Sequence, residues 1–172
     1  MNKKKLKYRV TYLEMNRKPS FDWPKNLKHK LSILLAESFP AWYFLFFYKQ
    51  VGKNYYWTDW LRKNEDEIDE FVNDKNVLLY TLIKDGWPVG FYMLDYRKKD
   101  ICDLSFFGLV DEVIGIGLGK YLLQTAILTA WDSKKIKKLT VNTCSLDHKS
   151  AIYLYQKYGF TPVKYKDLEK TV

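Results

Sequence analysis

EVIGIGLGKYLL, residues 112–123, contains three glycines at alternate positions and passes directly into helix-forming residues. Before it lies an apolar segment with the composition of a buried strand, ICDLSFFGLV (101–110). After its glycines an amphipathic helical pattern begins, LGKYLLQTAILTAWD (118–132). Backbone N–H groups at the start of a helix have no partner inside the helix and bind phosphate readily. The stretch therefore predicts an anion-binding loop between a central strand and a helix.

The spacing of these glycines excludes two common phosphate-binding loops. A dinucleotide-binding G-x-G-x-x-G that starts at Gly115 would need glycine at position 120, which is Lys120, and a start at Gly117 fails in the same way. A nucleoside-triphosphate loop that ends in Lys120 would need glycine at position 114, which is Ile114. We therefore expect the loop to hold a different anionic group.

Length and hydropathy limit the classes of protein to which the chain can belong. With 172 residues, 47% of them hydrophobic, the chain is long enough for one well-packed domain. It has no apolar run of the roughly 18 residues that a membrane span needs. No apolar segment of the secretory type follows the basic start of the chain. We therefore expect a cytoplasmic protein without a membrane partner.

Charge and cysteine content narrow the choice of ligands. The net charge of +9 is spread along the chain instead of forming one stripe, which argues against a dedicated nucleic-acid face and favours a solvated, lysine-rich surface. Cys102 and Cys144, together with two histidines, form no zinc-binding spacing, and we expect no metal.

Periodicity and turn residues predict the remaining elements. Pro40 and Gly52 are placed to begin and end a helix, and Asn64 is placed to cap the next one. The pair Asp85-Gly86 indicates a hairpin turn. The expected order after residue 76 is β-β-β-α-β-α-β. Expected strands cover 7–15, 77–84, 88–97, 101–110, 136–144 and 160–166, expected helices cover 40–52, 64–74, 118–132 and 148–159, and residues 27–37 fit either a strand or a helix.

Two separate motifs resemble those of the GCN5-related N-acetyltransferases. The first family signature, Q/R-x-x-G-x-G/A, is matched at its key positions by Ile114, Gly117 and Gly119, with isoleucine in place of the usual arginine or glutamine. The segment TVNTCSLDHKSAIYLYQKYGF (140–160) resembles the second family signature, a strand followed by a helix. The resemblance extends over residues 7–163 and is strongest to a bacterial branch whose substrates are poorly defined.

This resemblance implies a fold and a division of the chain. The implied fold is α/β (mixed α+β), with a mixed central sheet of about six to seven strands flanked by helices in the order β-α-α-β-β-β-α-β-α-β. One acetyltransferase domain would span residues 1–172. Its substrate-side helices would lie in residues 27–75 and its acetyl-CoA-binding core in residues 76–166.

The resemblance also implies a set of acetyl-CoA contacts. In the family the strand before the glycine loop pairs with the pantetheine arm, and the loop backbone holds the pyrophosphate. Because Ile114 lacks a polar side chain, we expect binding through main-chain donors at that point. The implied contacts are Leu109, Val110, Ile114, Gly115, Ile116, Gly117, Leu118, Gly119, Lys120, His148 and Tyr155.

Two residues match the catalytic positions of the family. Tyr155 corresponds to the tyrosine that protonates the departing thiolate, although a helical tyrosine packed on the sheet is the alternative. Asp103 corresponds to a strand glutamate that serves some members as general base, with ordered water as the alternative. His148 replaces a common asparagine and either relays a proton, holds a water or caps the helix, whereas Asp147 is the preferred helix cap.

Acceptor specificity in the family comes from the N-terminal helices, which are rich in aromatic residues here. We expect Trp42, Tyr48, Trp60 and Cys144 to contact the acceptor, with core packing as the alternative for the aromatic residues. The expected function is transfer of acetyl from acetyl-CoA to a small-molecule amine. The alternatives are acetylation of a protein lysine or N-terminus, and a non-catalytic basic domain that binds acyl-CoA or nucleic acid. A homodimer is also left open.

Overall fold

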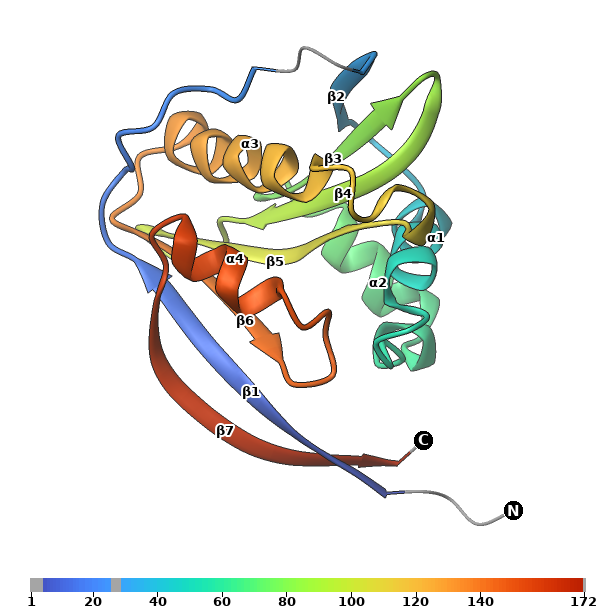
Figure 1. Ribbon diagram of the computed structural model, residues 1–172. Coiled ribbons are helices and arrows are strands. Elements are labelled where there is room, and N and C mark those ends of the chain that lie inside the picture. The colour runs from blue at the N-terminus through green and yellow to red at the C-terminus, as the bar shows by residue number, and fades with distance from the viewer. Residues whose placement is uncertain (1–4, 26–28, 172) are drawn as a thin grey trace.

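The computed structural model describes residues 5–25 and 29–171. One seven-stranded sheet, of order β2-β3-β4-β5-β6-β1-β7, runs through the molecule and is flanked by four helices (Figure 1). The elements are β1 Lys5–Met15, β2 Leu31–Ala36, α1 Ala41–Gly52, α2 Glu65–Val72, β3 Val77–Lys84, β4 Trp87–Asp95, β5 Ile101–Leu109, α3 Leu118–Ser133, β6 Lys138–Cys144, α4 Ala151–Lys157 and β7 Thr161–Thr171, with short 3-10 turns at Trp60–Arg62 and Asp111–Val113. The predicted mixed α/β class is confirmed.

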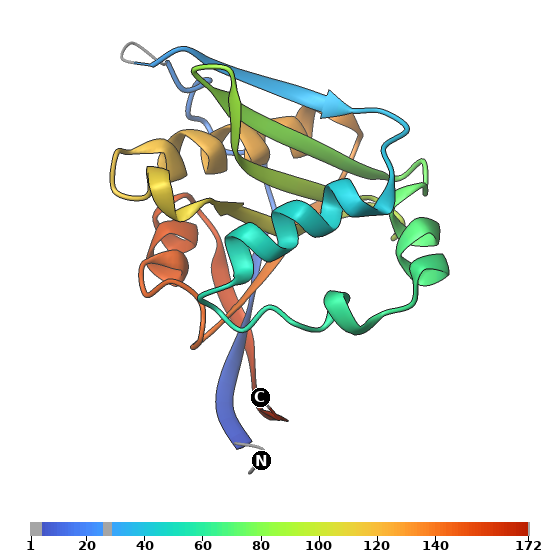
Figure 2. The ribbon, with the colours of Figure 1, turned by 90° about the vertical axis from the view of Figure 1, so that its right-hand side faces the viewer.

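The helices cover both faces of the sheet, α1 and α2 on one side and α3 and α4 on the other (Figure 2). Neighbouring residues of β4 show why, because successive side chains of a strand point to opposite faces. Phe91 stacks on Phe47 of α1, with ring centroids 5.1 Å apart. Tyr92 shares a hydrogen bond of 3.1 Å with the Thr129 hydroxyl of α3. Both residues are fully buried, so β4 lies at the centre of the core.

Local signals in the sequence are confirmed where they were strongest. The Asn64 side chain accepts a 2.8 Å hydrogen bond from the Glu67 N–H and caps α2. Asp85 and Gly86, with φ of 51° and 92°, form the hairpin turn between β3 and β4. Residues 27–37, which fit either element, contain the strand β2, so two strands precede α1 where the expected order has one. Residues 26–28 of that segment lie outside the described part of the chain.

The sheet separates at one place, between the parallel strands β5 and β6. Their pairing runs from Ile101 with Lys138 to Asp103 with Thr140 and goes no further. Beyond this point β5 continues along β4 as far as Leu109, and β6 continues along β1. The two strands therefore diverge toward their carboxyl ends, and the space between them opens toward the glycine loop.

The first strand of the chain lies between β6 and β7. β1 pairs antiparallel with both neighbours over its second half, whereas its first half pairs with β7 alone. The two strands therefore continue as a ribbon past the end of β6 (Figure 1). β7 extends to Thr171, five residues past the end of the predicted strand, because β1 offers it a partner along that whole length.

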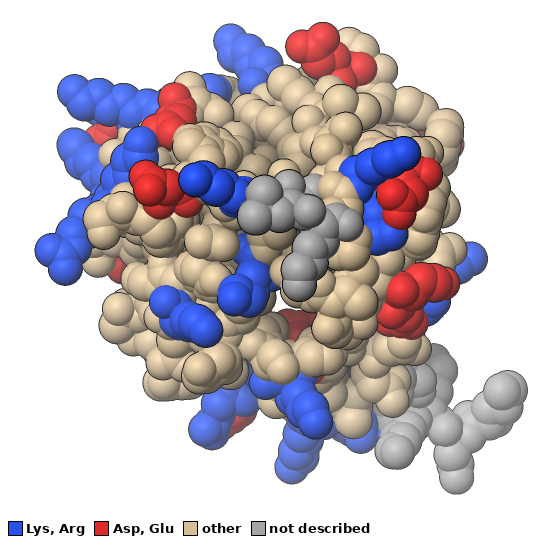
Figure 3. Space-filling view, turned by 45° about the horizontal axis from the view of Figure 1, so that its top comes forward, with Lys and Arg blue, Asp and Glu red and all other residues tan. Residues whose placement is uncertain are grey.

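Charged side chains are intermixed on the surface. On the face shown in Figure 3, acidic side chains lie among the lysines and arginines, as the spread of charge along the sequence predicts. Within residues 5–25 and 29–171, no helix combines the length and apolar character needed to cross a membrane.

Candidate active site

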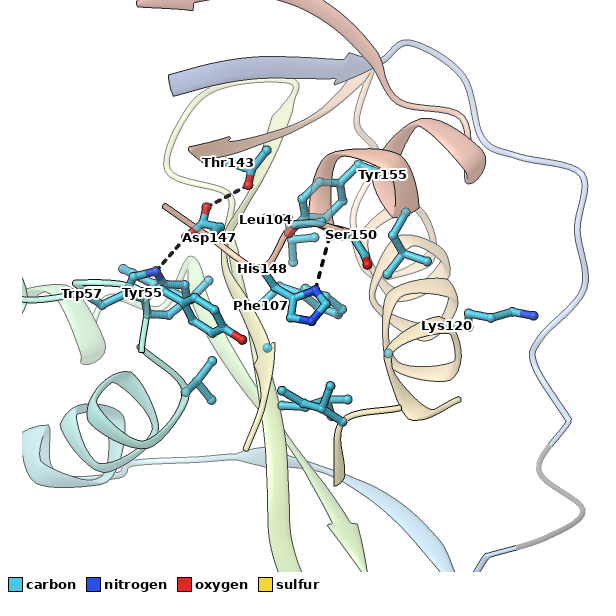
Figure 4. Close-up of a pocket in the computed structure, with 18 of the residues that line it drawn as sticks. Tyr55, Trp57, Leu104, Phe107, Lys120, Thr143, Asp147, His148, Ser150 and Tyr155 are labelled. Atoms are coloured by element: carbon cyan, nitrogen blue, oxygen red, sulfur yellow. Dashed lines mark hydrogen bonds between the residues drawn. The ribbon is translucent and has the colours of Figure 1, made fainter. Parts of the chain in front are cut away.

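A cavity of about 360 Å³ occupies the space where β5 and β6 diverge (Figure 4). Its walls are formed by the second half of β5, the glycine loop, the end of β6, one side of α4 and the loop that follows α1. The lining is mainly apolar, and the volume lies in the range of small-molecule sites, about 300–1,000 Å³. The cavity can hold an extended chain against the edge of a strand.

The glycine loop closes one end of this cavity. Gly115 and Gly117 both have φ of 90°, a conformation that L-residues rarely adopt. Gly117 is the N-cap of α3, so the first N–H groups of that helix face the loop's open side without helical partners. Gly119 is already helical, and a Cβ there would meet nothing closer than 3.9 Å. The need for glycine at 119 therefore does not come from the chain itself.

The predicted loop contacts divide into two groups. Leu109, Ile114, Gly115, Gly117, Gly119 and Lys120 line the cavity. Ile116 is 47% exposed, whereas Leu118 and Val110 are buried in the core and do not line it. The Val110 N–H donates to the Val89 carbonyl at 2.9 Å, which removes it as a donor for a ligand. The Lys120 ammonium points away from the other labelled side chains (Figure 4).

Tyr155 of α4 lines the cavity opposite the loop that follows α1. It is 5% exposed and packs edge-on against Phe107 of β5, with ring centroids 6.1 Å apart. Burial raises the pKa of the Tyr155 phenol above its ordinary value of 10.0, and the negative charge of Asp147 raises it further. The phenol therefore stays protonated at neutral pH and can donate a hydrogen bond.

Asp103 does not line this cavity. It is paired with Thr140 at the point where β5 and β6 diverge. Its two carboxylate oxygens accept hydrogen bonds from Ser105 Oγ at 2.8 Å and from Thr140 Oγ1 at 2.5 Å. Asp103 instead lines a second cavity of about 380 Å³, beside Glu14 and Arg97. Ser105 lines the first cavity, so its hydroxyl connects Asp103 to the cavity that Tyr155 also lines.

At the start of α4 it is His148, and not Asp147, whose side chain accepts a backbone hydrogen bond. His148 lines the cavity, and its Nδ1 accepts a 3.3 Å hydrogen bond from the Ser150 N–H at the start of α4. The prediction that Asp147 caps α4 is wrong, because none of the hydrogen bonds that its carboxylate accepts comes from an N–H of that helix. The Asp147 carboxylate instead accepts hydrogen bonds from Thr143 Oγ1, the Cys144 N–H and Trp57 Nε1.

The four residues expected to contact the acceptor are not brought together. Trp42 is 66% exposed on the outer side of α1, and Tyr48 is buried, with its pKa raised to about 12 by desolvation. Trp60 packs against Phe71 at 4.5 Å between ring centroids. Cys144 is half-buried, and none of the four lines either cavity. Tyr48 and Trp60 instead pack in or against the core, which was the alternative expectation for them.

Other residues line the cavity on the side of the loop that follows α1. Tyr55 and Trp57 come from the loop after α1, and Asn142 lines both cavities. The close approach of α1 to β5 was signalled by Gly108, where a Cβ would lie 2.2 Å from Val51 Cγ1. The sequence carried no sign of which aromatic residues would face inward, because that depends on how the loop is held.

Metal ligation has no support within residues 5–25 and 29–171. No group of three or more His, Cys, Asp or Glu side chains is placed there to hold a metal ion.

Comparison with known proteins places the chain in one family. A family model described as "Acetyltransferase (GNAT) family" matches residues 36–160, which is more than half of the chain. No curated protein matches the sequence.

Solved structures share the fold at low identity. A GCN5-related N-acetyltransferase from Kribbella flavida has a TM-score of 0.63 and 14% identity over 95% of this chain and 57% of its own. A GNAT family acetyltransferase from Elizabethkingia anophelis with acetyl-CoA bound has a TM-score of 0.57 and 22% identity over 78% of each chain. An aminoglycoside acetyltransferase from an uncultured soil metagenomic sample, in complex with trehalose, has a TM-score of 0.55 and 14% identity over 74% of this chain and 84% of its own.

The chain is shorter than several of the proteins it resembles. It spans 62% of the length of a Staphylococcus epidermidis protein of unknown function, at a TM-score of 0.64 and 13% identity. It likewise spans little more than half of the Kribbella flavida chain.

Proposed function

The chain belongs to the acetyltransferase (GNAT) family, and we propose that it moves an acetyl group from acetyl-CoA directly to a primary amine of a small molecule. Members of this family are acetyltransferases that use acetyl-CoA. The observation that carries the proposal is the cavity between the diverging strands, with the glycine loop at one end and Tyr155 in its wall. Residues 76–166 would form its acetyl-CoA-binding core, and residues 27–75 its acceptor side.

The residues around the loop suit acetyl-CoA. The start of α3 supplies main-chain donors and the positive end of a helix dipole to a pyrophosphate. The absence of a Cβ at Gly119 leaves room for such a group to approach the helix backbone. Leu109, Ile114 and His148 offer the mainly apolar wall that a pantetheine arm would contact. Bound there, acetyl-CoA supplies a reactive acetyl thioester.

We assign to Tyr155 the stabilisation of the leaving sulfur. Its hydroxyl belongs to a buried phenol that lines the cavity and stays protonated at neutral pH. A donor held ready in a dry site stabilises developing negative charge without having to be reoriented. Tyr155 would therefore donate a hydrogen bond, and finally its proton, to the thiolate as the thioester bond breaks.

We assign to Asp103 the removal of the proton from the acceptor ammonium, through Ser105. The Ser105 hydroxyl donates to Asp103 at 2.8 Å and lines the cavity that Asp103 does not reach. As Ser105 Oγ takes a proton from the amine nitrogen, its own hydroxyl proton passes to Asp103 Oδ2. Thr140 holds the other carboxylate oxygen and keeps Asp103 in place during the transfer.

We assign the binding of the acceptor amine to Tyr55 and Trp57. Their rings stand at the end of the cavity away from the glycine loop, where an amine can approach the acetyl group. Aromatic faces attract cations, and a cavity of about 360 Å³ suits a small acceptor better than a protein chain.

Two measurements on the full chain test the proposed function. Titration calorimetry should show acetyl-CoA binding, and a thiol-release assay should show turnover with at least one small amine among spermidine, free amino acids and lysine-containing peptides. Turnover with peptides alone would replace the small-molecule acceptor with a protein. Absence of acetyl-CoA binding would overturn the whole proposal.

The relay from the amine to Asp103 makes a separate prediction. Asp103→Asn and Ser105→Ala should each lower kcat about 100-fold, and the double variant should lose little more, because the two groups act in one proton path. Asp95→Asn is the matched control, since that carboxylate also lines the second cavity but pairs with Arg97. Additive losses in the double variant would show that Ser105 is not in the path.

A further inference from the structure

The loop of residues 53–59, which follows α1, forms the acceptor side of the cavity and is tightly wound at its start. The N–H groups of Tyr55 and Trp57 both donate to the Gly52 carbonyl, at 2.9 and 3.2 Å. Trp57 packs directly on the end of α1, because a Cβ at Gly52 would lie 2.2 Å from the Trp57 Cβ. The loop therefore has a defined conformation, and its distance from the opposite wall depends on what holds it across the cavity.

One carboxylate connects this loop to the opposite wall. Asp147 Oδ1 accepts a 3.0 Å hydrogen bond from Trp57 Nε1 (Figure 4). Asp147 Oδ2 accepts from Thr143 Oγ1 and from the Cys144 N–H, both at 2.7 Å. Thr143 and Cys144 end β6, on the far side of the strand separation. A single side chain thus joins the 53–59 loop to the end of β6, and the two partners Trp57 and Asp147 lie 90 residues apart in the chain.

Other contacts also hold the loop to the rest of the chain. Asn54 donates to Asp111 at 2.7 Å, and the Lys170 ammonium donates to the Tyr56 carbonyl at 2.6 Å. Both contacts are exposed, whereas the contact between Trp57 and Asp147 is partly buried. Hydrogen bonds to a charged group are strong when water is excluded and weak at the surface. The Trp57 ring also packs against Tyr48 and Phe106, with ring centroids 5.4 and 6.1 Å apart, and the hydrogen bond to Asp147 is the contact that ties it to the opposite wall.

We infer that Asp147 is a positioning residue that clamps the 53–59 loop to the end of β6 and so sets the width of the acceptor side of the cavity. The kinetic part of this inference rests on the proposed acetyl transfer, whereas the structural part does not. Asp147 itself lines the cavity, and the role assigned to it is to hold Trp57 in place and not to bind the acceptor. Its removal should loosen acceptor binding while leaving the glycine loop in place.

Hydrogen exchange measures the clamp without any substrate. In Trp57→Phe and Asp147→Ala the amides of the 53–59 loop should exchange about tenfold faster than in the unchanged chain, and combining the two changes should add little. Asp147→Asn keeps an oxygen for the indole and should exchange more slowly than Asp147→Ala. Tyr56→Phe is the matched control, because the Tyr56 hydroxyl makes no hydrogen bond with the described residues. Exchange that is unchanged in Asp147→Ala would overturn the clamp.

Steady-state kinetics then test its role in acceptor binding. With spermidine, or whichever amine of the panel is turned over, Asp147→Ala and Trp57→Phe should raise the amine KM about tenfold and change the acetyl-CoA KM less than about twofold. An equal rise in both KM values would overturn the assignment to the acceptor side. If the chain does not bind acetyl-CoA, the proposed function fails, and the exchange measurement alone decides whether the clamp exists.

Discussion

The glycines of the 112–123 stretch differ in what the backbone requires of them. Gly115 and Gly117 adopt a φ that side chains disfavour, and a Cβ at either position would meet no other atom within 4 Å. Gly119 is helical, and the chain around it has space for a methyl group. A requirement for glycine at 119 can therefore come only from a ligand that approaches the helix closely.

This difference predicts opposite effects on stability. Gly119→Ala should raise the free energy of unfolding by up to about 1 kcal/mol, because alanine is the better helix former, yet weaken acetyl-CoA binding about tenfold. Gly117→Ala should weaken binding and also cost about 1–2 kcal/mol of stability. Urea unfolding and titration calorimetry measure the two effects. The hairpin residue Gly86, with φ of 92° and open space, is the control: Gly86→Ala should lose stability but keep its affinity.

Tyr155 carries a prediction about rate. Tyr155→Phe removes the hydroxyl and leaves the ring packed on Phe107 and Phe160, so the fold should be retained. We expect kcat to fall about 100-fold while the acetyl-CoA dissociation constant stays within about twofold, because the hydroxyl acts on the leaving sulfur and not on the bound ground state. Thiol-release kinetics and calorimetry give both values. Unchanged kcat would remove Tyr155 from the mechanism.

At the scale of elements, the helices before β3 form a scaffold for the acceptor side. Phe44 of α1 packs against Trp60 and Phe106, with ring centroids 5.2 and 5.1 Å apart. This aromatic cluster holds the first turn of α1 against β5 and the Trp60–Arg62 turn. Of the residues expected to contact the acceptor, Tyr48 and Trp60 instead pack in this aromatic cluster.

The cap of α2 makes this support testable. Asn64→Ala should lower the free energy of unfolding by about 1 kcal/mol, because the Glu67 N–H loses its partner at the start of the helix. Urea unfolding measures the change. Asn73→Ala, at the exposed opposite end of the same helix, is the control and should have a much smaller effect. Equal losses in the two variants would show that the cap contributes nothing specific.

At the scale of the whole molecule, buried phenols make stability depend on alkaline pH. Burial raises the pKa of Tyr48 to about 12 and raises the pKa values of Tyr92, Tyr96 and Tyr155 above the ordinary 10.0. A raised folded-state pKa means that the folded chain holds the proton more tightly than the unfolded chain does. The resulting stability is fully present below about pH 9 and is lost as pH rises above about 10.

Urea unfolding at a series of pH values checks this dependence. The free energy of unfolding should fall by several kcal/mol between about pH 9 and pH 12. In Tyr92→Phe the curve should be flatter, because one of the buried phenols is gone. A free energy independent of pH over this range would contradict the burial of these hydroxyls.

Whether a feature of the fold or the site could be predicted from the sequence depends on how far apart in the chain the interacting residues lie. The Asn64 cap, the Asp85-Gly86 turn and the glycine loop were predictable, because each depends on residues close together in the sequence. That Asp103 would lie outside the cavity was not predictable. The register of β5 against β4 shifts between Met93 and Leu94, and this irregularity changes which side chains face which side. After it, Phe106 packs against α1 and Phe107 against Tyr155.

The sequence by itself determined the order of the elements after residue 76, the family and the place of the glycine loop, because periodicity, turn residues and motif spacing are local properties. Only the tertiary structure decided what surrounds the cavity. The contact of Trp57 with Asp147 spans 90 residues, and the separation of β5 from β6 arises because each strand follows a different neighbour. Such relations depend on how distant segments pack, which no local pattern records.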